Sequence, residues 1–283
     1  MHGLLAVSAL HCAHIHPHQH SHYTHLSTHH QTLALGLFTT ALPTLSPATS
    51  PAFLLLSSFV FLLNTYPLAR AQSRGYTPIT IPSIVQSLSL IRGTKSLLLL
   101  SLDVWEHARS GPMRELFADV TPAAHPRGPF VDKLDGLVDA VRGRLAGSPA
   151  QAKTRVALLA AVEALRHTYA LLSAARAADW RDRLWTWAVV VPDGVLELLE
   201  GECPVALVVL AYFCVLVASV ECGASRDEEQ WFLKGWSGGV MECVVGVLER
   251  KEEEEEEGVW REWVEWPVGC VREGLNVLET SGE

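Results

Sequence analysis

Charged side chains are missing from the start of this sequence, because no Asp, Glu, Lys or Arg precedes Arg70. A mitochondrial presequence needs arginines, and the opening MHGLLAVSAL also lacks the basic residues and small-residue cleavage site of a secretory signal. The net charge of −9 owes much to six consecutive glutamates at 252–257, and no basic face suited to phosphate groups is evident. We therefore expect this chain to make no direct contact with nucleic acid.

Closely spaced cysteine pairs are also missing. The six cysteines stand at positions 12, 203, 214, 222, 243 and 270, with no C-x2-C spacing among them. We expect them to be reduced and mostly buried. Ten of the 13 histidines fall in the first thirty residues, several of them at alternating positions from 14 to 22 around Pro17. A zinc site needs ligands fixed by an ordered scaffold, so we predict a mobile histidine-rich loop at 14–22 and neither a metal ion nor another cofactor in this chain.

No histidine follows His167, and this absence bears on the segment GWSGG at 235–239. The segment fits the G-x-S-x-G pattern of a nucleophile elbow, with Ser237 as the reactive residue. That enzyme class needs a buried strand before the serine and an acid and a histidine after it. Without the later histidine, the pattern predicts a helix or helix-entry serine beside close-packing glycines, and we expect no enzymatic activity.

Strand patterns are rare. Only YTPITI at 76–81 alternates strand-forming residues, and prolines interrupt it. Elsewhere the apolar residues follow a helical period, as at Leu158, Val162, Leu165 and Tyr169, which would share one face. The sequence therefore predicts an all-α fold of many helices around an apolar interior. We expect one domain over 1–283, with the histidine-rich stretch 14–22 and the acidic stretch 251–258 as inserted loops.

Two apolar runs, at 52–63 and 205–220, have the composition of membrane spans. A helix rises about 1.5 Å per residue, so even the second run reaches only about 24 Å, short of the roughly 30 Å hydrocarbon layer. We expect both to be buried core helices and the chain not to be transmembrane.

Large aromatic residues are abundant in the second half of the chain. Each buries roughly 150–250 Å², which suits either plain core packing or the wall of an apolar ligand cavity. The set comprises Trp180, Trp185, Trp187, Trp231, Phe232, Trp236, Trp260, Trp263 and Trp266.

Taken in order, several stretches resemble the C-terminal regulatory domain of fungal binuclear zinc cluster (Zn2Cys6) transcription factors, in the group of the sterol uptake control proteins. In that family an apolar helix is followed by a W-[WF]-L-x-G-W segment and then by a Trp-x-x-Trp-Pro ending. WFLKGW at 231–236 and WVEWP at 263–267 fit that order and spacing. The other similar stretches are HHQTLALGLFTTAL (29–42), FLLLSSFVFLLNTYPLA (53–69), LIRGTKSLL (90–98) and VPDGVLELLEGECPVALVVLAYFCVLV (191–217).

The resemblance implies a regulatory domain that senses a ligand or controls activation, with a sterol or another apolar small molecule as the ligand. It also implies a homodimer, contact with the transcription machinery, and a nuclear location shared with the cytoplasm. The family's DNA-binding zinc cluster is absent from this sequence, so no DNA-binding role passes to any residue here. The residues that the resemblance suggests as ligand-binding are Tyr212, Phe213, Leu216, Trp231, Trp236 and Met241.

Two other functions remain open. A helical scaffold without a ligand, used for dimerisation or partner docking, would share the helices but keep a solid core. A serine hydrolase acting through Ser237 is the third hypothesis.

Overall fold

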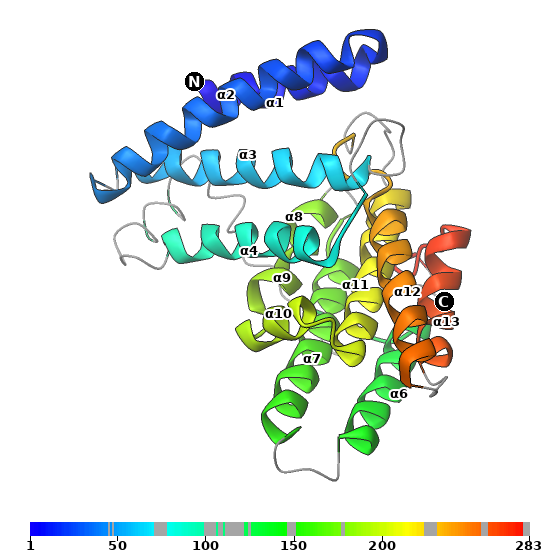
Figure 1. The fold of residues 1–283 in the computed structure, drawn as a ribbon. Coiled ribbons are helices and arrows are strands. Elements are labelled where there is room, and N and C mark those ends of the chain that lie inside the picture. Colours follow the sequence, from blue (N-terminus) through cyan, green and yellow to red (C-terminus); the bar gives the residue numbers. More distant parts are fainter. Residues whose placement is uncertain are drawn as a thin grey trace. The chain divides into compact units, whose positions relative to one another are not determined.

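The computed structural model describes residues 1–44, 46, 48–70, 78–98, 106, 110, 122–123, 126–145, 151–176, 179–223, 231–255 and 260–279. Within these residues the chain is helical and has no strand, which confirms the predicted all-α fold (Figure 1). The chain divides into two compact units. The first unit comprises Met1–Pro67 and Ser87–Asp119, and the second comprises Leu68–Gln86 and Val120–Glu283.

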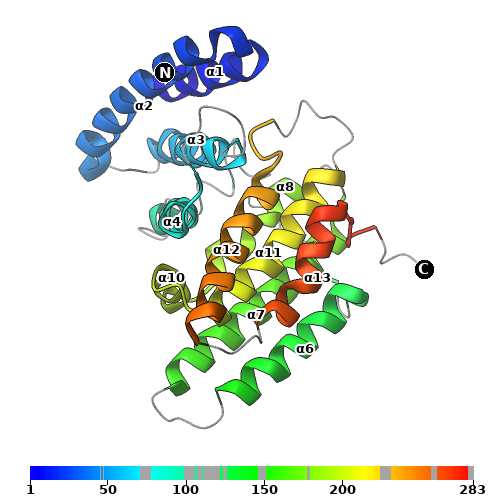
Figure 2. The ribbon, with the colours of Figure 1, turned by 45° about the vertical axis from the view of Figure 1, so that its right-hand side comes forward.

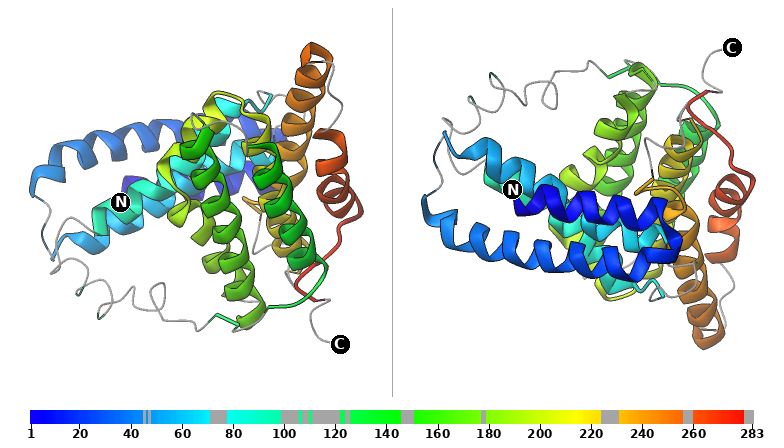
Figure 3. Two further views of the ribbon diagram at one scale, coloured as in Figure 1. Left: turned by 90° about the horizontal axis from the view of Figure 1, so that it is seen from below. Right: turned by 90° about the horizontal axis from the view of Figure 1, so that it is seen from above.

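The first unit is built from the N-terminal helices. Helices α1 (His2–Ile15) and α2 (His20–Ala41) lie side by side as a hairpin (Figure 3), and most of α3 (Ser50–Ala69) belongs to the same unit. Close approach is possible because small residues face inward. A Cβ on Gly3 would come within 2.7 Å of the Leu56 side chain on α3, and the Ser27 hydroxyl donates to the Ala6 carbonyl across 2.8 Å.

The predicted histidine-rich loop is much shorter than expected. Helix α1 continues to Ile15 and α2 begins at His20, so only residues 16–19 lie outside α-helix, and Pro17–Gln19 form a 3₁₀ turn. The prediction of a mobile tract over 14–22 is therefore wrong, because alternating histidines are tolerated on helix surfaces. The acidic stretch also departs from prediction in part, since 251–255 continue α12, while 256–258 lie outside the described residues.

The second unit surrounds one apolar helix, α11 (Pro204–Gly223), with other helices (Figure 2). Every residue from Val205 to Val220 is buried. The helices that contact α11 are α7 (Ala152–Ala174), α8 (Trp180–Leu184), α10 (Asp193–Glu200), α12 (Trp236–Glu255) and α13 (Trp260–Glu273).

The remaining described helices complete the two units. Helices α6 (Pro129–Arg144) and α9 (Thr186–Val190) pack against α7. Helix α4 (Ile81–Leu98) belongs to both units, since its residues up to Gln86 fall in the second unit and those from Ser87 fall in the first. The apolar stripe predicted from Leu158 to Tyr169 is confirmed as the inner face of α7, because Leu158, Val162, Leu165 and Tyr169 are all fully buried.

Helix length corrects one argument made from the sequence. The apolar runs at 52–63 and 205–220 extend into helices of 20 residues, which at about 1.5 Å per residue reach roughly 30 Å. By length and composition alone, α3, α7 and α11 could each cross a membrane. For α11, however, 89% of the apolar window is buried inside the protein, as in a core helix, against 39% for α3.

Candidate functional site

The six predicted ligand-binding residues come from three consecutive parts of the second unit. Tyr212, Phe213 and Leu216 lie on α11 and are all buried. Trp236 and Met241 are buried on α12, and Trp231 is half-buried in the turn that precedes α12. Five of the six predicted residues are therefore core positions, but the six side chains do not all lie in one cluster.

Phe213 and Trp236 belong to one aromatic cluster. The Phe213 ring stacks on Trp187 with centroids 4.5 Å apart, and Trp185 meets Trp236 edge-on at 5.8 Å. Phe213 also contacts Trp185 and Trp236, at 5.8 and 6.0 Å. These distances are those of rings in direct packing contact. We refer to Trp185, Trp187, Phe213 and Trp236 as the Trp187 cluster.

Tyr212 belongs to a second aromatic cluster, because consecutive helical residues project about 100° apart. Its ring lies 5.8 Å from Trp266 and 6.4 Å from Phe130, and Phe130 in turn lies 5.0 Å from Tyr169. Burial raises the pKa of the Tyr212 phenol to about 12, so it stays neutral. The adjacent residues Tyr212 and Phe213 thus serve different parts of the core.

One polar group in the Trp187 cluster lacks a partner. The indole N–H of Trp187 donates to the Ala161 carbonyl at 3.1 Å. The Nε1 of Trp236 is buried, and no acceptor for it exists among the described residues. An unpaired buried donor costs on the order of 1–3 kcal/mol, and native proteins rarely leave one in place without a reason.

Ser237 is held by a residue that the sequence argument did not consider. Its backbone N–H donates to Oε1 of Glu221 at 3.0 Å, and its hydroxyl donates to Oε2 at 2.6 Å. Glu221 lies near the end of α11, while Ser237 lies in the first turn of α12. The carboxylate therefore caps the amino terminus of α12, where unpaired N–H groups and the helix dipole favour an anion.

Burial dominates the electrostatics of this pair. It raises the pKa of Glu221 from 4.5 to about 7, although hydrogen bonds from Ser237 and from the N–H groups of Gly235 and Trp236 act in the opposite direction. A carboxylate of this pKa could accept a proton from a nucleophile. Ser237 itself is only 3% exposed, so a substrate cannot reach its hydroxyl in this arrangement. The geometry is that of a helix cap.

The turn into α12 depends on Gly235. Its φ of +94° lies in the region that favours glycine, and a Cβ there would stand 2.9 Å from the carbonyl oxygen of Ala69. The prediction of a helix-entry serine beside close-packing glycines is confirmed, since α12 begins at Trp236 and a Cβ on Gly239 would come within 2.7 Å of the Ile79 side chain.

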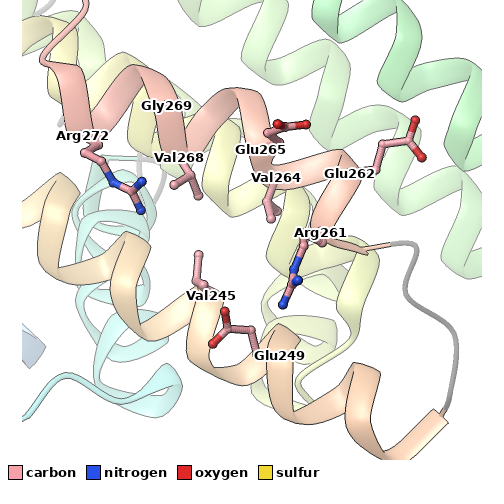
Figure 4. A pocket seen from close by; sticks show the side chains of 9 residues that line it. All are labelled: Val245, Glu249, Arg261, Glu262, Val264, Glu265, Val268, Gly269 and Arg272. Carbon is pink, nitrogen blue, oxygen red and sulfur yellow. The ribbon is translucent and has the colours of Figure 1, made fainter.

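A groove of about 690 Å³ runs between α12 and α13 (Figure 4). Val245, Val264 and Val268 form its apolar part, and Arg261 and Arg272 lie toward its two ends. None of the six predicted residues lines this groove; the other residues that do are Glu249, Glu262, Glu265 and Gly269.

The histidines form no evident metal centre. His2 and His30 pair across the hairpin at 3.1 Å, and the His14 ring meets Tyr66 edge-on at 6.2 Å. Among the residues with described positions, no group of three or more His, Cys, Asp or Glu could hold a metal ion.

Comparisons with protein-family models, with curated proteins and with solved structures found no match to this chain.

Proposed function

We propose that this chain is a regulatory domain of the fungal zinc cluster transcription factor type, from the sterol-regulatory group, without the DNA-binding cluster. The observation that carries the proposal is the ordered pair of tryptophan motifs, at 231–236 and 263–267, after an apolar helix at 204–223. In the structure the first motif forms the turn into α12, the second lies within α13, and both helices pack against α11. The two motifs and the apolar helix follow the family's order, and the three helices concerned pack together. This supports a shared structural module rather than a chance match of short motifs.

The proposed ligand is a sterol or another rigid apolar molecule that carries one polar group. The Trp187 cluster offers flat apolar surfaces, and the Trp236 N–H, which has no acceptor among the described residues, offers a donor for a ligand oxygen. Because the rings are in contact, binding requires a second arrangement of α11 and α12 in which they separate. The ligand would then favour that arrangement in proportion to its differential affinity for it.

The remaining parts of the proposal follow from the same resemblance. The domain acts in the nucleus and the cytoplasm, forms homodimers and contacts the transcription machinery. It neither binds nucleic acid itself nor spans a membrane. It performs no catalysis and needs no cofactor. The deep burial of α11 supports its role as a core helix rather than a membrane span.

A ligand-free scaffold for dimerisation or partner docking is a second candidate. The observation that favours it is the close contact of rings within both aromatic clusters, at 4.5 to 6.4 Å, which describes a filled core. Such a scaffold would use its outer surfaces rather than its interior.

Thermal denaturation with and without a sterol separates the two candidates. A ligand present at 100 times its Kd stabilises the native state by about 2.7 kcal/mol, which raises the melting temperature measurably. We expect Trp236→Phe to remove most of this rise, because phenylalanine lacks the N–H donor. Trp263→Phe is the matched control and should keep it. A melting temperature that no sterol moves, in protein shown to be folded, would favour the scaffold.

A further inference from the structure

Among the described residues, exposed large hydrophobic side chains are concentrated near the amino-terminal end. Nine of the twelve large hydrophobic side chains that are exposed within the described residues fall in the first 55 positions. They are Met1, Leu4, Leu5, Ile15, Leu33, Leu35, Leu37, Leu42 and Leu55. Isolated exposed leucines are ordinary, but a concentration of this kind marks an interaction surface.

The exposed residues of α1 lie along one side of the helix. Met1, Leu4, Leu5 and Ile15 follow helical spacing, together with the exposed Ser8, while Gly3, Ala6, Leu10 and Ala13 form the buried side. The opposite sides of α1 are thus both apolar. Among the described residues, α2 and α3 contact the buried side, where a Cβ on Gly3 would meet Leu56 and Phe59 of α3 and the Ala6 carbonyl accepts from Ser27 of α2.

The segment of α2 from Leu33 to Phe38 is apolar all round, between the polar residues Thr32 and Thr39. The segment LALGLF at 33–38 contains no polar side chain, yet only Ala34 is buried. A helix that is hydrophobic on all sides belongs in a protein core or in lipid. We refer to the exposed leucines at 33, 35, 37 and 42, together with the exposed apolar residues of α1, as the hairpin apolar surface.

The hydroxyls of four threonines on α2 near this surface are already hydrogen-bonded. The hydroxyls of Thr28, Thr32 and Thr40 donate to carbonyls four residues back in α2, at 2.9 to 3.0 Å. Thr39 bonds the carbonyls of Leu35 and Gly36 in the same way, at 3.1 and 3.0 Å. Hydroxyls bonded within their own helix can enter an apolar medium without leaving a donor unpaired.

Formal charge points to the kind of partner. Protein interfaces usually carry a polar rim with charged residues, which gives them specificity. No Asp, Glu, Lys or Arg occurs from Met1 to Ala69, and histidine is the only basic side chain there, so covering this surface desolvates none of those four residue types. The same absence removes the attraction to anionic lipids that basic helices use.

We propose that the hairpin apolar surface docks on a lipid bilayer, with α1 and the second half of α2 lying in the plane of the interface. Helix α1 has 14 residues and so spans only about 21 Å, too short to cross the bilayer. The first half of α2 carries five histidines, which keep that end in the aqueous layer. Zwitterionic lipid suffices, and added salt does not weaken the contact. This inference is independent of the sterol-sensing role proposed above.

Flotation of the full chain with phosphatidylcholine vesicles at pH 7.5 tests this proposal. We expect the protein to float with the vesicles equally well in 0.05 M and 0.5 M salt. The double change Leu33→Glu and Leu37→Glu should reduce the vesicle-bound fraction by roughly tenfold or more, since it places two charges in the apolar layer. Val156→Glu on α7 is the matched control, because Val156 is 65% exposed and lies in the other unit. It should leave flotation unchanged.

Each other outcome overturns the proposal. Protein that stays in the aqueous fraction has no lipid-binding surface. Flotation that requires anionic lipid and is lost in 0.5 M salt is electrostatic binding elsewhere on the chain. The unmodified protein could instead fail to float and form a dimer in solution that the double change dissociates. That result assigns the surface to a second copy of the chain. Circular dichroism and thermal melts establish that each variant is folded.

Discussion

Glu221 near the end of α11 and Ser237 at the start of α12 are joined by two hydrogen bonds through the two oxygens of one carboxylate. The pair fixes the relative position of two helices that supply five of the six predicted ligand-binding residues. It also explains GWSGG in physical terms, since the serine is held as part of a helix cap. Any rearrangement that separates α11 from α12 must first break this pair.

Stability should fall with rising pH because of Glu221. Its pKa is raised from 4.5 in the unfolded chain to about 7 in the folded one, so the folded state holds the proton more tightly. The stabilisation is complete below about pH 4.5 and is lost as pH rises through 7, by on the order of 3 kcal/mol. Glu221→Gln keeps an acceptor for Ser237 and should flatten this dependence in urea denaturation measured from pH 5 to 8. Glu265→Gln is the control, because Glu265 is exposed on the surface of α13. An unchanged pH slope in Glu221→Gln would contradict the assignment.

Replacing Gly235 should destabilise the second unit. Gly235→Ala forces a side chain into the positive-φ region and toward the Ala69 carbonyl, at a cost of about 1–3 kcal/mol. Gly246→Ala within α12 is a useful comparison, because no atom beyond the adjacent backbone of its own helix lies within 4 Å of the added Cβ. That change should be neutral or stabilise the helix by up to about 1 kcal/mol. Equal effects of the two substitutions in chemical denaturation would show that the turn carries no special constraint.

Phe213 should be among the most costly positions to truncate. It is fully buried and touches Trp185, Trp187 and Trp236. Phe213→Ala should lower the free energy of unfolding by about 3–5 kcal/mol, because the rigid rings around it cannot close the cavity. A loss below about 1 kcal/mol in urea denaturation would indicate that the cluster already contains open space.

Ser237→Ala tests the structural role of the serine against a catalytic one. Removing the hydroxyl leaves the Glu221 carboxylate with one donor fewer, which should cost about 1 kcal/mol of stability. Hydrolysis of an activated ester should be no faster with the unmodified protein than with the variant. Ester hydrolysis that the unmodified chain performs and Ser237→Ala abolishes would restore the hydrolase hypothesis.

Local patterns in the sequence predicted much of the fold, because periodicity and turn chemistry act over a few residues. The stripe from Leu158 to Tyr169 is buried as predicted, and Pro204 begins α11 as a proline at the first helical position should. Glycine often marks a turn, yet the segment RGTKS at 92–96 lies inside α4. Gly93 has open space around it, and an exposed glycine can be tolerated within a helix.

Contacts between distant residues were beyond such patterns. Glu221 lies 16 positions before Ser237, and nothing local marks it as the partner of that serine. The division of Tyr212 and Phe213 between two clusters depends on which helices pack on each side of α11. The exposure of the α1 and α2 leucines likewise depends on which helices cover them, and the sequence alone would place those leucines in a core.

Energy transfer from tryptophan to a fluorescent sterol tests the central claim most directly, because it requires the ligand to lie close to the aromatic core. The proposed regulatory domain should give energy transfer that saturates at about one sterol per chain, and non-fluorescent sterol should compete for the site. Trp236→Phe should weaken this binding, whereas Trp263→Phe should retain it. Transfer that neither saturates nor responds to competitor, in protein that is folded and monodisperse, would contradict the account.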